Sequence, residues 1–298
     1  GGEIVMAGGR LAVEELEAKG KQEDIEKWVR NNRDLFYKLS SAYMKKRGME
    51  KALMAYIIEQ HHLCGPGARD PFALQMEWLV SDHSIYCREN ALYALYAGGQ
   101  PEHVIKAYHI LTRMRIEHSS KMVTDGLLSF QGDRELLAEE LWKNWTHYST
   151  YYKICFVNFF RMVSGNFTER LLTVLKDEEN DRELRLAVIR YFRKHKYDKA
   201  WGYLCCLIEE WRESDWEYAA LSALALESYP GKRTIDVLKK GCESRNWYIR
   251  YNSAQSLGKL IDHEQKGKFI QNEKDIYAKE MMAYKFMGTE ESTDDGCD

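Results

Sequence analysis

The stretch that decides the fold is Asn246-Trp-Tyr-Ile-Arg250-Tyr-Asn-Ser-Ala-Gln-Ser-Leu257-Gly-Lys-Leu260, which has a counterpart earlier in the chain. That counterpart is Ser84-Ile-Tyr-Cys-Arg88-Glu-Asn90-Ala-Leu-Tyr-Ala-Leu95. Arginine, asparagine and leucine hold the same relative positions in both, 162 residues apart. The same apolar template fits the sequence between them, with reference residues at Arg88, Lys121, Lys153, Arg185, Ala219 and Arg250. Their spacing of 31 to 34 residues predicts a repeat.

Each copy carries apolar residues along one side of a helix. Counted from the reference residue, positions −1, +3, +4 and +7 are mostly apolar, which is the spacing of a helix buried on one face. Position −1 is Cys87, Ser120, Tyr152, Leu184, Tyr218 and Ile249. Position +7 is Leu95, Leu128, Phe160, Phe192, Leu226 and Leu257. Asp125 at position +4 is the exception, so the second copy fits the template least well.

A second amphipathic segment lies between each pair of these helices. The segments are near 71–80, 102–115, 134–146, 167–176, 199–212 and 233–243. All four prolines fall at predicted turns between helices, where the missing N–H and fixed φ of proline are harmless. Gly98-Gly99, Gly132, Gly165 and Gly231 fall at such turns too. Helix–turn–helix units with a period of about 32 residues predict stacked helical hairpins. The fold class is therefore predicted to be all-α, an α-α superhelix of about six hairpins with helical caps at both ends.

The best copy, Asn246-x-x-Ile-Arg250 followed by small residues and Leu257-Gly, resembles the second helix of a HEAT repeat, in the armadillo-like class. Asp181-x-x-Leu-Arg185 has the same form, and Asp215-x-x-Tyr-Ala219 lacks the arginine. The resemblance covers about residues 70–262 and implies a fold rather than an activity. It implies a ladder of aspartate and arginine between repeats, with Arg88, Arg185 and Arg250 in structural roles.

The ends of the chain do not keep the repeat spacing. Residues 1–63 are predicted to form a helical N-terminal cap in three pieces, near 10–19, 22–31 and 34–61, with Asp34 as an N-cap. The repeats occupy 64–262, and 263–287 contains a C-terminal capping helix near 272–287. The acidic tail 288–298 is predicted to be disordered.

Composition limits the function classes. The net charge of −3 does not favour a nucleic-acid-binding protein, because such proteins usually carry an excess of basic residues that contact the phosphate backbone. Seven cysteines, an odd number that includes the vicinal pair Cys205-Cys206, indicate thiols in a reducing compartment such as the cytoplasm. No apolar run approaches the roughly 18 residues of a transmembrane helix. The chain begins Gly1-Gly2-Glu3 without methionine, so an upstream anchor or signal that has been removed stays open.

A candidate binding face lies opposite the apolar stripe. In HEAT-like stacks the second helices line the concave side, so positions −2, +2, +5 and +9 are expected to form the floor of a groove. The residues are Tyr86, Asn90, Tyr93, Tyr151, Asn158, Arg190, Lys194, Glu217, Tyr248, Asn252 and Gln255. Tyrosine and arginine are enriched at binding hot spots. The alternative is that these side chains are ordinary solvated positions of a helix.

Motifs for catalysis or metal binding are missing from the sequence. No G-x-S-x-G, P-loop or dinucleotide motif occurs. His61-His62-Leu63-Cys64 and the pair His109 and His118 lack the spacing of a zinc site, and Cys205 has no activating base nearby in sequence. We therefore expect no catalytic residue, no metal and no cofactor.

Two functions are compatible with these features. The first is a non-enzymatic scaffold that binds a protein or peptide, in the cytoplasm or at the cytoplasmic face of a membrane. Bacterial HEAT proteins, some of them membrane-anchored, have stretches similar to Asn246-Trp-Tyr-Ile-Arg250-Tyr-Asn. The second is a HEAT-like DNA alkylation-repair glycosylase or another solenoid-based modifying enzyme. The tryptophans and acids of such an enzyme are present, but its basic surplus is not.

Overall fold

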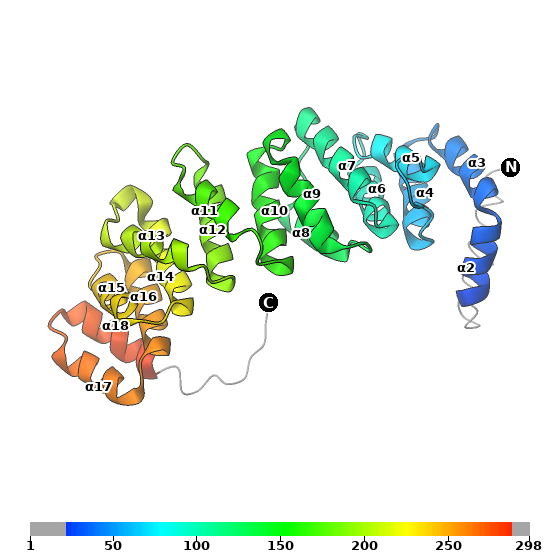
Figure 1. Ribbon diagram of the computed structural model, residues 1–298. Coiled ribbons are helices and arrows are strands. Elements are labelled where there is room, and N and C mark those ends of the chain that lie inside the picture. The colour runs from blue at the N-terminus through cyan, green and yellow to red at the C-terminus, as the bar shows by residue number, and fades with distance from the viewer. Residues whose placement is uncertain (1–21, 288–298) are drawn as a thin grey trace. The chain divides into compact units, whose positions relative to one another are not determined.

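The structure is a computed structural model that describes residues 22–287, and this range is all-α (Figure 1). It contains 17 α-helices and three short 3-10 turns, with no strand among the described residues. The predicted all-α class is confirmed. The chain divides into two compact units, residues 1–152 and 153–298. The expected helix near 10–19 and the acidic tail 288–298 lie outside the described residues.

In the first unit, from Gly48 onward, each helix packs against the helix two places further along the chain. The helices are α2 (Gln22–Asn31), α3 (Arg33–Tyr43), α4 (Gly48–Gln60), α5 (Pro71–Leu79), α6 (Ile85–Gly98), α7 (Pro101–Met114), α8 (Ser120–Ser129) and α9 (Arg134–Lys143), then the turn η1 (Trp145–His147). Helix α4 packs on α6 and α6 on α8, while α5 packs on α7 and α7 on α9. Even- and odd-numbered helices thus form two layers.

The second unit repeats this alternation. Its helices are α10 (Thr150–Val163), whose first residues belong to the first unit, α11 (Thr168–Lys176), α12 (Arg182–Lys194), α13 (Asp198–Glu209), α14 (Trp216–Ala225), α15 (Lys232–Cys242), α16 (Trp247–Leu260), α17 (His263–Asn272) and α18 (Ile276–Met287), with turns η2 (Glu213–Asp215) and η3 (Leu226–Ser228). Helices α12, α14, α16 and α18 pack in succession, and α13 packs on α15. Each odd helix also packs on an even neighbour, as α15 does on α16.

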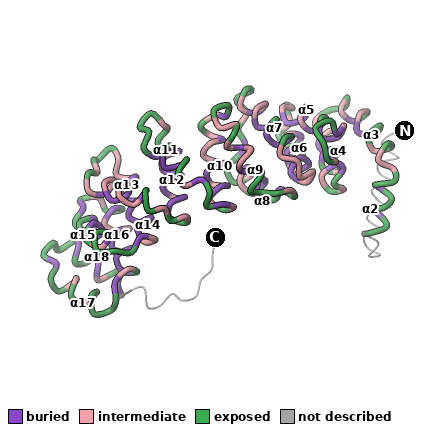
Figure 2. The backbone as a smooth tube through the Cα atoms, in the orientation of Figure 1, coloured by how far each residue is buried: buried purple, intermediate pink, exposed green. Residues whose placement is uncertain are grey.

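The predicted apolar stripe is the core. In α6, α10, α12, α16 and the α14–η3 segment, every residue at positions −1, +3, +4 and +7 is at most 6% exposed. Leu95, Phe160, Phe192 and Leu257 are at most 1% exposed, which confirms their predicted burial. Figure 2 shows this alternation of buried and exposed residues along the helices.

The second copy was predicted one residue out of place. In α8 the buried residues are Val123, Gly126 and Leu127, whereas Leu128 is only half-buried and Asp125 is exposed. The reference residue is therefore Ser120 rather than Lys121, and Asp125 falls on the solvent side, where a carboxylate costs nothing. Gly126 explains why this copy is unusual, because a Cβ there would lie 2.4 Å from the ring of Tyr96.

The same spacing continues into both ends, which the sequence argument had placed outside the repeat. In α4 the residues Met54, Ala55 and Ile58 are fully buried, at +3, +4 and +7 from Lys51. In α18 the buried residues are Ala278, Met282 and Phe286, at −1, +3 and +7 from Lys279. The apolar side of α4 packs on α6 and that of α18 on α16, as in the central copies.

The ends of the helices follow side-chain capping. Asp133, Asp181 and Asn246 each accept hydrogen bonds from two backbone N–H groups of the following helix. The single helix expected over 34–61 is wrong, because α3 ends at Tyr43 and α4 begins at Gly48. Asp34 is also not the N-cap: Asn32 occupies that position, and Asp34 lies in the first turn of α3.

Candidate binding surface

The residues predicted to form a binding face are not equally exposed. Tyr86 is 59% exposed and Tyr248 is 53% exposed, and Lys194 is also exposed. Tyr93, Asn158 and Arg190 are half-buried. Because these residues belong to two units, each unit is a separate candidate surface.

Two asparagines at position +2 of the predicted repeat bond to the preceding even helix and are not free on the surface. The side-chain amide of Asn90 donates to the carbonyl of Ala52 at 2.9 Å, which ties α6 to α4. Asn252 donates to the carbonyl of Ala220 at 2.8 Å, which ties α16 to α14. The two bonds join equivalent positions of successive even helices, so both asparagines have structural roles.

Four other members of the predicted face also have bonds within the protein. The hydroxyl of Tyr151 donates to the carbonyl of His118. The Gln255 side-chain oxygen accepts from Lys285 at 3.2 Å. Glu217 forms an ion pair with Arg182, and Lys194 Nζ lies 3.9 Å from the sulfur of Met162.

The reference arginines bind backbone carbonyls of the segment just before their own helix, which is a loop for Arg88 and Arg250 and the last turn of α11 for Arg185. Arg88 donates to the carbonyl of Asp82 at 2.8 Å, and Arg250 donates to that of Ser244 at 2.9 Å. Arg185 donates to the carbonyl of Leu175 at 2.9 Å. This differs from the aspartate–arginine ladder between repeats that the HEAT resemblance implied, although the structural role of the arginines agrees with it.

An apolar surface covers α4 and α6 in the first unit. Helix α4 exposes Met49 (68%), Leu53 (40%) and Tyr56 (47%), and α6 contributes Tyr86 and Tyr93. These residues, which we call the α4–α6 surface, lie at positions −2, +2 and +5 of their helices. The three residues of α4 were not predicted from the sequence, because the step from Lys51 to Arg88 is 37 residues and includes the loop before α5. The apolar spacing of Met54, Ala55 and Ile58 could have revealed that α4 follows the same pattern as α6, and therefore which of its residues are exposed.

Close contacts fix α4 against α6. The Cys87 sulfur donates to the carbonyl of Gly48 at 3.0 Å, and a Cβ on Gly48 would meet the Ser84 Cβ at 3.3 Å. Lys51 forms an ion pair with Asp82 at the same end. Together with Asn90, these contacts align the helices so that equal positions lie side by side.

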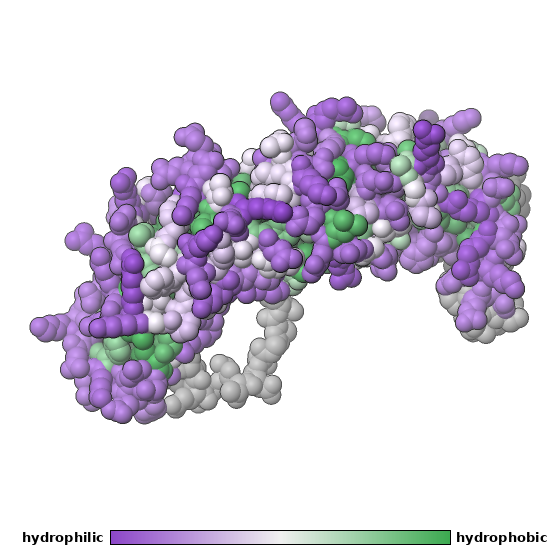
Figure 3. All heavy atoms as spheres, viewed as in Figure 1, coloured by the Kyte–Doolittle hydropathy of each residue, from purple (hydrophilic) through white to green (hydrophobic). Residues whose placement is uncertain are grey.

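Acidic groups surround the far end of this surface. Burial raises the pKa of Tyr93, and the charges of Asp125, Glu89 and Glu59 raise it further. The phenol therefore stays protonated, and the electrostatic potential around it is negative. Figure 3 shows hydrophobic patches as separate areas within a mostly hydrophilic side of the molecule.

In the second unit, cations gather near the C-terminal end of α12. Burial lowers the pKa of Arg161, as do the charges of Arg190 and Arg193. Arg161 and Lys194 lie on neighbouring helices, since the carbonyl of Arg161 bonds the ring of His195 at 2.8 Å. Arg193 lies 3.5 Å from Glu227. We call Arg161, Arg190, Arg193 and Lys194 the basic cluster.

Aromatic side chains occupy the other end of this unit. Trp216 stacks on Tyr248 with ring centroids 4.9 Å apart, and Trp247 stacks on Tyr251 at 4.8 Å. The Lys285 ammonium lies 3.4 Å from the Tyr251 ring centroid, a cation–π contact. Most of these rings bind each other, so they stabilise the packing of α14, α16 and α18.

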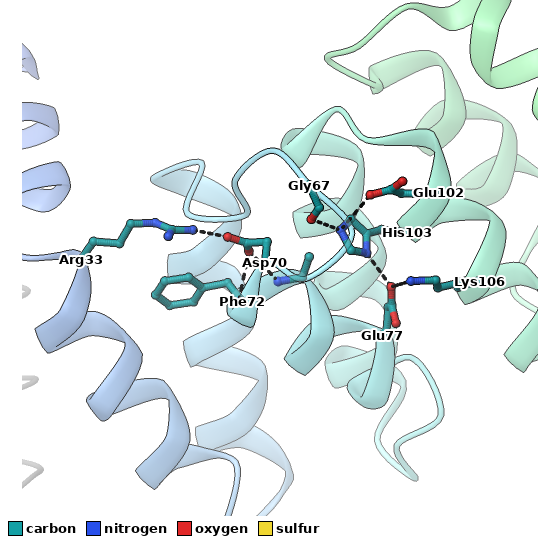
Figure 4. Close-up of polar contacts among 9 residues, drawn as sticks. Arg33, Gly67, Asp70, Phe72, Glu77, Glu102, His103 and Lys106 are labelled. Atoms are coloured by element: carbon teal, nitrogen blue, oxygen red, sulfur yellow. Dashed lines mark hydrogen bonds and ion pairs between the residues drawn. The ribbon is translucent and has the colours of Figure 1, made fainter.

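A polar network surrounds His103 in the first unit (Figure 4). One ring nitrogen lies 2.5 Å from Glu77 and the other 3.1 Å from the carbonyl of Gly67. Burial alone would lower the pKa of His103, but the bond to Glu77, the bond to Gly67 and the charge of Glu77 outweigh it and raise the pKa. Lys106 also reaches Glu77, at 3.4 Å. Every member is bonded to another, which indicates that the network has a structural role: it fixes α7 against α5 and against the loop that contains Gly67.

The loop between α4 and α5, residues 61–70, is also held by side-chain hydrogen bonds and an ion pair. Arg33 lies 2.5 Å from Asp70 and donates to the carbonyl of Leu63 at 2.6 Å. The other oxygen of Asp70 caps α5 through the N–H groups of Phe72 and Ala73. A cavity of about 270 Å³ beside this region is lined by Glu77, Lys106, His109, Ile110 and Arg113. No serine, threonine or cysteine is among these lining residues.

Possible metal ligands and the Cys205 thiol were two candidate sources of chemistry in the sequence. Across residues 22–287, no three His, Cys, Asp or Glu side chains are placed to hold a metal ion. Cys205 is fully buried, and burial raises the pKa of its thiol to about 11, so it is not a thiolate near neutral pH. None of the described helices combines the length and hydropathy that spanning a bilayer requires.

Comparison with known proteins adds no family. No protein-family model matches the sequence, and no curated protein matches it either.

Proposed function

We propose that the protein is a non-enzymatic interaction scaffold, built from HEAT-like helical repeats, that binds a protein segment on the exposed side of its even helices. Two sets of equivalent bonds support a repeat: those of Asn90 and Asn252, and those of Arg88 and Arg250. Such an array buries each apolar stripe against its neighbours and leaves the opposite side for binding.

The α4–α6 surface is the observation that carries this proposal. Met49, Leu53, Tyr56 and Tyr86 are each at least 40% exposed on two helices locked side by side. Contiguous apolar side chains of this kind on a soluble surface mark interaction sites. The acids near Tyr93 favour a partner segment that carries a basic residue beside its apolar anchors.

The test is a pair of matched double variants of the whole chain, used to capture a partner from its native cell and then to measure its affinity. Leu53→Ala with Tyr86→Ala should weaken binding by about tenfold or more, since each truncated anchor costs about 1 kcal/mol or more. Leu74→Ala with Leu136→Ala removes side chains that are 43% and 48% exposed on the odd helices α5 and α9. This control should bind normally.

Equal binding by both double variants would refute the α4–α6 surface as the site. Melting temperatures measured on the same samples separate lost contacts from lost folding, because all four side chains are exposed. A failure of the whole chain to retain any partner would refute the scaffold itself.

A further inference from the structure

The cavity of about 270 Å³ in the first unit is lined mostly by one face of α7. Lys106, His109 and Arg113 follow one another at intervals of three and four residues, which places them along the same side of this helix. Ile110 adds an apolar side chain, and Glu77 comes from α5. Pockets for drug-sized molecules measure roughly 300–1,000 Å³, so this cavity suits a smaller ligand.

The carboxylate of Glu77 already has cationic partners. It lies 2.5 Å from a ring nitrogen of His103 and 3.4 Å from Nζ of Lys106 (Figure 4). Burial lowers the pKa of His103, but the bonds to Glu77 and to the carbonyl of Gly67 raise it overall, which favours the charged ring. Glu102 lies 3.9 Å from the other ring nitrogen of His103 and does not line the cavity. The charge of Glu77 is therefore matched and does not exclude an anion from this site.

Arg113 is a lining cation that has no such partner. It is exposed in the last turn of α7. Within residues 22–287, no carboxylate lies within ion-pairing distance of its guanidinium, and no acceptor bonds to it. A guanidinium presents five N–H donors in a planar fork that matches the two oxygens of a carboxylate. The cavity thus carries one unmatched positive charge with directed donors.

His109 lies between the two cations on this face. Its imidazole has no hydrogen-bond partner among the described residues, and its Nε2 is shielded from solvent. The ring packs on Tyr148, with centroids 5.0 Å apart, and on His147, at 5.5 Å. Burial lowers the pKa of His109, and the charge of His147 lowers it further. The ring is therefore mostly neutral near pH 7 and, with Ile110, supplies a flat and weakly polar part of the cavity.

We propose that this cavity binds a small organic carboxylate. Arg113 and Lys106 hold the carboxylate group, and the apolar body of the ligand lies against Ile110. Lys106 can contribute because an ammonium has three donors, and Glu77 is the carboxylate with which it pairs. A carboxylate carries one negative charge and matches the single unmatched cation, whereas a phosphate monoester carries about −1.5 to −2 near pH 7. The site lies on α5 and α7 of the odd layer, so the inference is independent of the α4–α6 surface.

The experiment titrates sodium benzoate into the full chain, labelled with ¹⁵N, at constant low ionic strength. Benzoate should shift the amide signals of residues 106–113 in a saturable manner, with a Kd on the order of 1 mM for so small a ligand. The pKa of the His109 ring, measured by NMR, should rise in the complex because a nearby anion favours the protonated imidazole. Benzamide has nearly the same shape without the charge, and it should leave these signals unchanged.

Two matched variants locate the site. Arg113→Gln should weaken benzoate binding by about tenfold or more, since hydrogen bonds to charged groups contribute that much. Arg30→Gln removes an exposed arginine from the last turn of α2 and should bind benzoate normally. Melting temperatures of both variants should equal that of the unchanged chain, because both side chains are exposed.

Several results would overturn the proposal. Shifts of equal size with benzamide would show that the charge is not recognised. Equal benzoate affinity in Arg113→Gln, or no saturable shift well above the expected Kd, would remove the site itself. Phenyl phosphate should bind no more tightly than benzoate, and tighter binding of phenyl phosphate would refute the carboxylate as the preferred ligand.

Discussion

Gly126→Ala tests the packing of α8 against α6, where the sequence predicted the wrong spacing. A Cβ at residue 126 would lie 2.4 Å from Cε2 and 3.1 Å from Cζ of Tyr96. This ring cannot move aside easily, because it is fully buried and its hydroxyl lies 2.5 Å from that of Tyr108. Overpacking costs about 1–3 kcal/mol, and a contact as short as 2.4 Å places this substitution in the upper part of that range, about 2–3 kcal/mol. The better helix propensity of alanine offsets about 1 kcal/mol of this cost. We expect a net loss of about 1–2 kcal/mol.

Gly202→Ala is the matched control, since Gly202 also lies in a helix, α13, but its Cβ would meet no atom within 4 Å. This variant should gain about 0.5–1 kcal/mol from helix propensity alone. Urea unfolding followed by circular dichroism measures both, and hydrogen exchange of the Val123 and Leu127 amides locates the effect in α8. If Gly126→Ala is neutral or stabilising, α8 does not approach Tyr96 as closely as the structure shows.

Three further predictions concern the core, the repeated side-chain bond and pH. Leu257→Ala should cost about 2–5 kcal/mol in urea unfolding because Leu257 is fully buried, whereas Lys259→Ala, which removes one exposed ion pair, should cost less than about 1 kcal/mol. Asn90→Ala should lower stability by about 1 kcal/mol, measured by thermal melting, because its bond to α4 is lost while the helix remains. The pKa of His103 is raised in the folded protein, so its contribution is fully present below its unfolded pKa of about 6.5 and is lost as the pH rises through the folded pKa. In Glu77→Gln this loss should disappear from the pH dependence of the urea midpoint, and NMR titration of the ring should show a lower pKa.

Hydrophobic spacing was sufficient to predict most of the helices. Residues such as Leu95, Phe192 and Leu257 recur at a fixed interval because each must face a neighbouring helix, and that requirement is visible in one dimension. The error in α8 arose because Gly126, which has no hydrophobic side chain, occupies the tightest contact with α6. A template that scores apolar residues cannot recognise a position where the absence of a side chain permits the packing.

The binding face was harder to predict than the core. Hydrophobic spacing placed Asn90 and Asn252 on the side of the helix opposite the core, and both side chains are half-buried there. Spacing could not show that their amides reach the preceding even helix. Such bonds depend on how far apart two helices lie, and that distance is set by contacts such as Gly48 with Ser84. The contribution of α4 was missed for a different reason, namely the long loop that separates it from α6.

Position along each even helix therefore decides which side chains bond to a neighbouring helix and which stay exposed. A side chain at +2 lies over the groove between two even helices, so a short amide there is drawn into a bond with the backbone of the preceding helix. At −2, in the first turn, Met49 and Tyr86 are 68% and 59% exposed, whereas Tyr151 and Glu217 bond within the protein and Tyr248 stacks on Trp216. Substitutions of Met49 or Tyr86 should thus have little effect on stability. Those at +2, where an asparagine ties the helices together, should change stability first and binding only as a consequence.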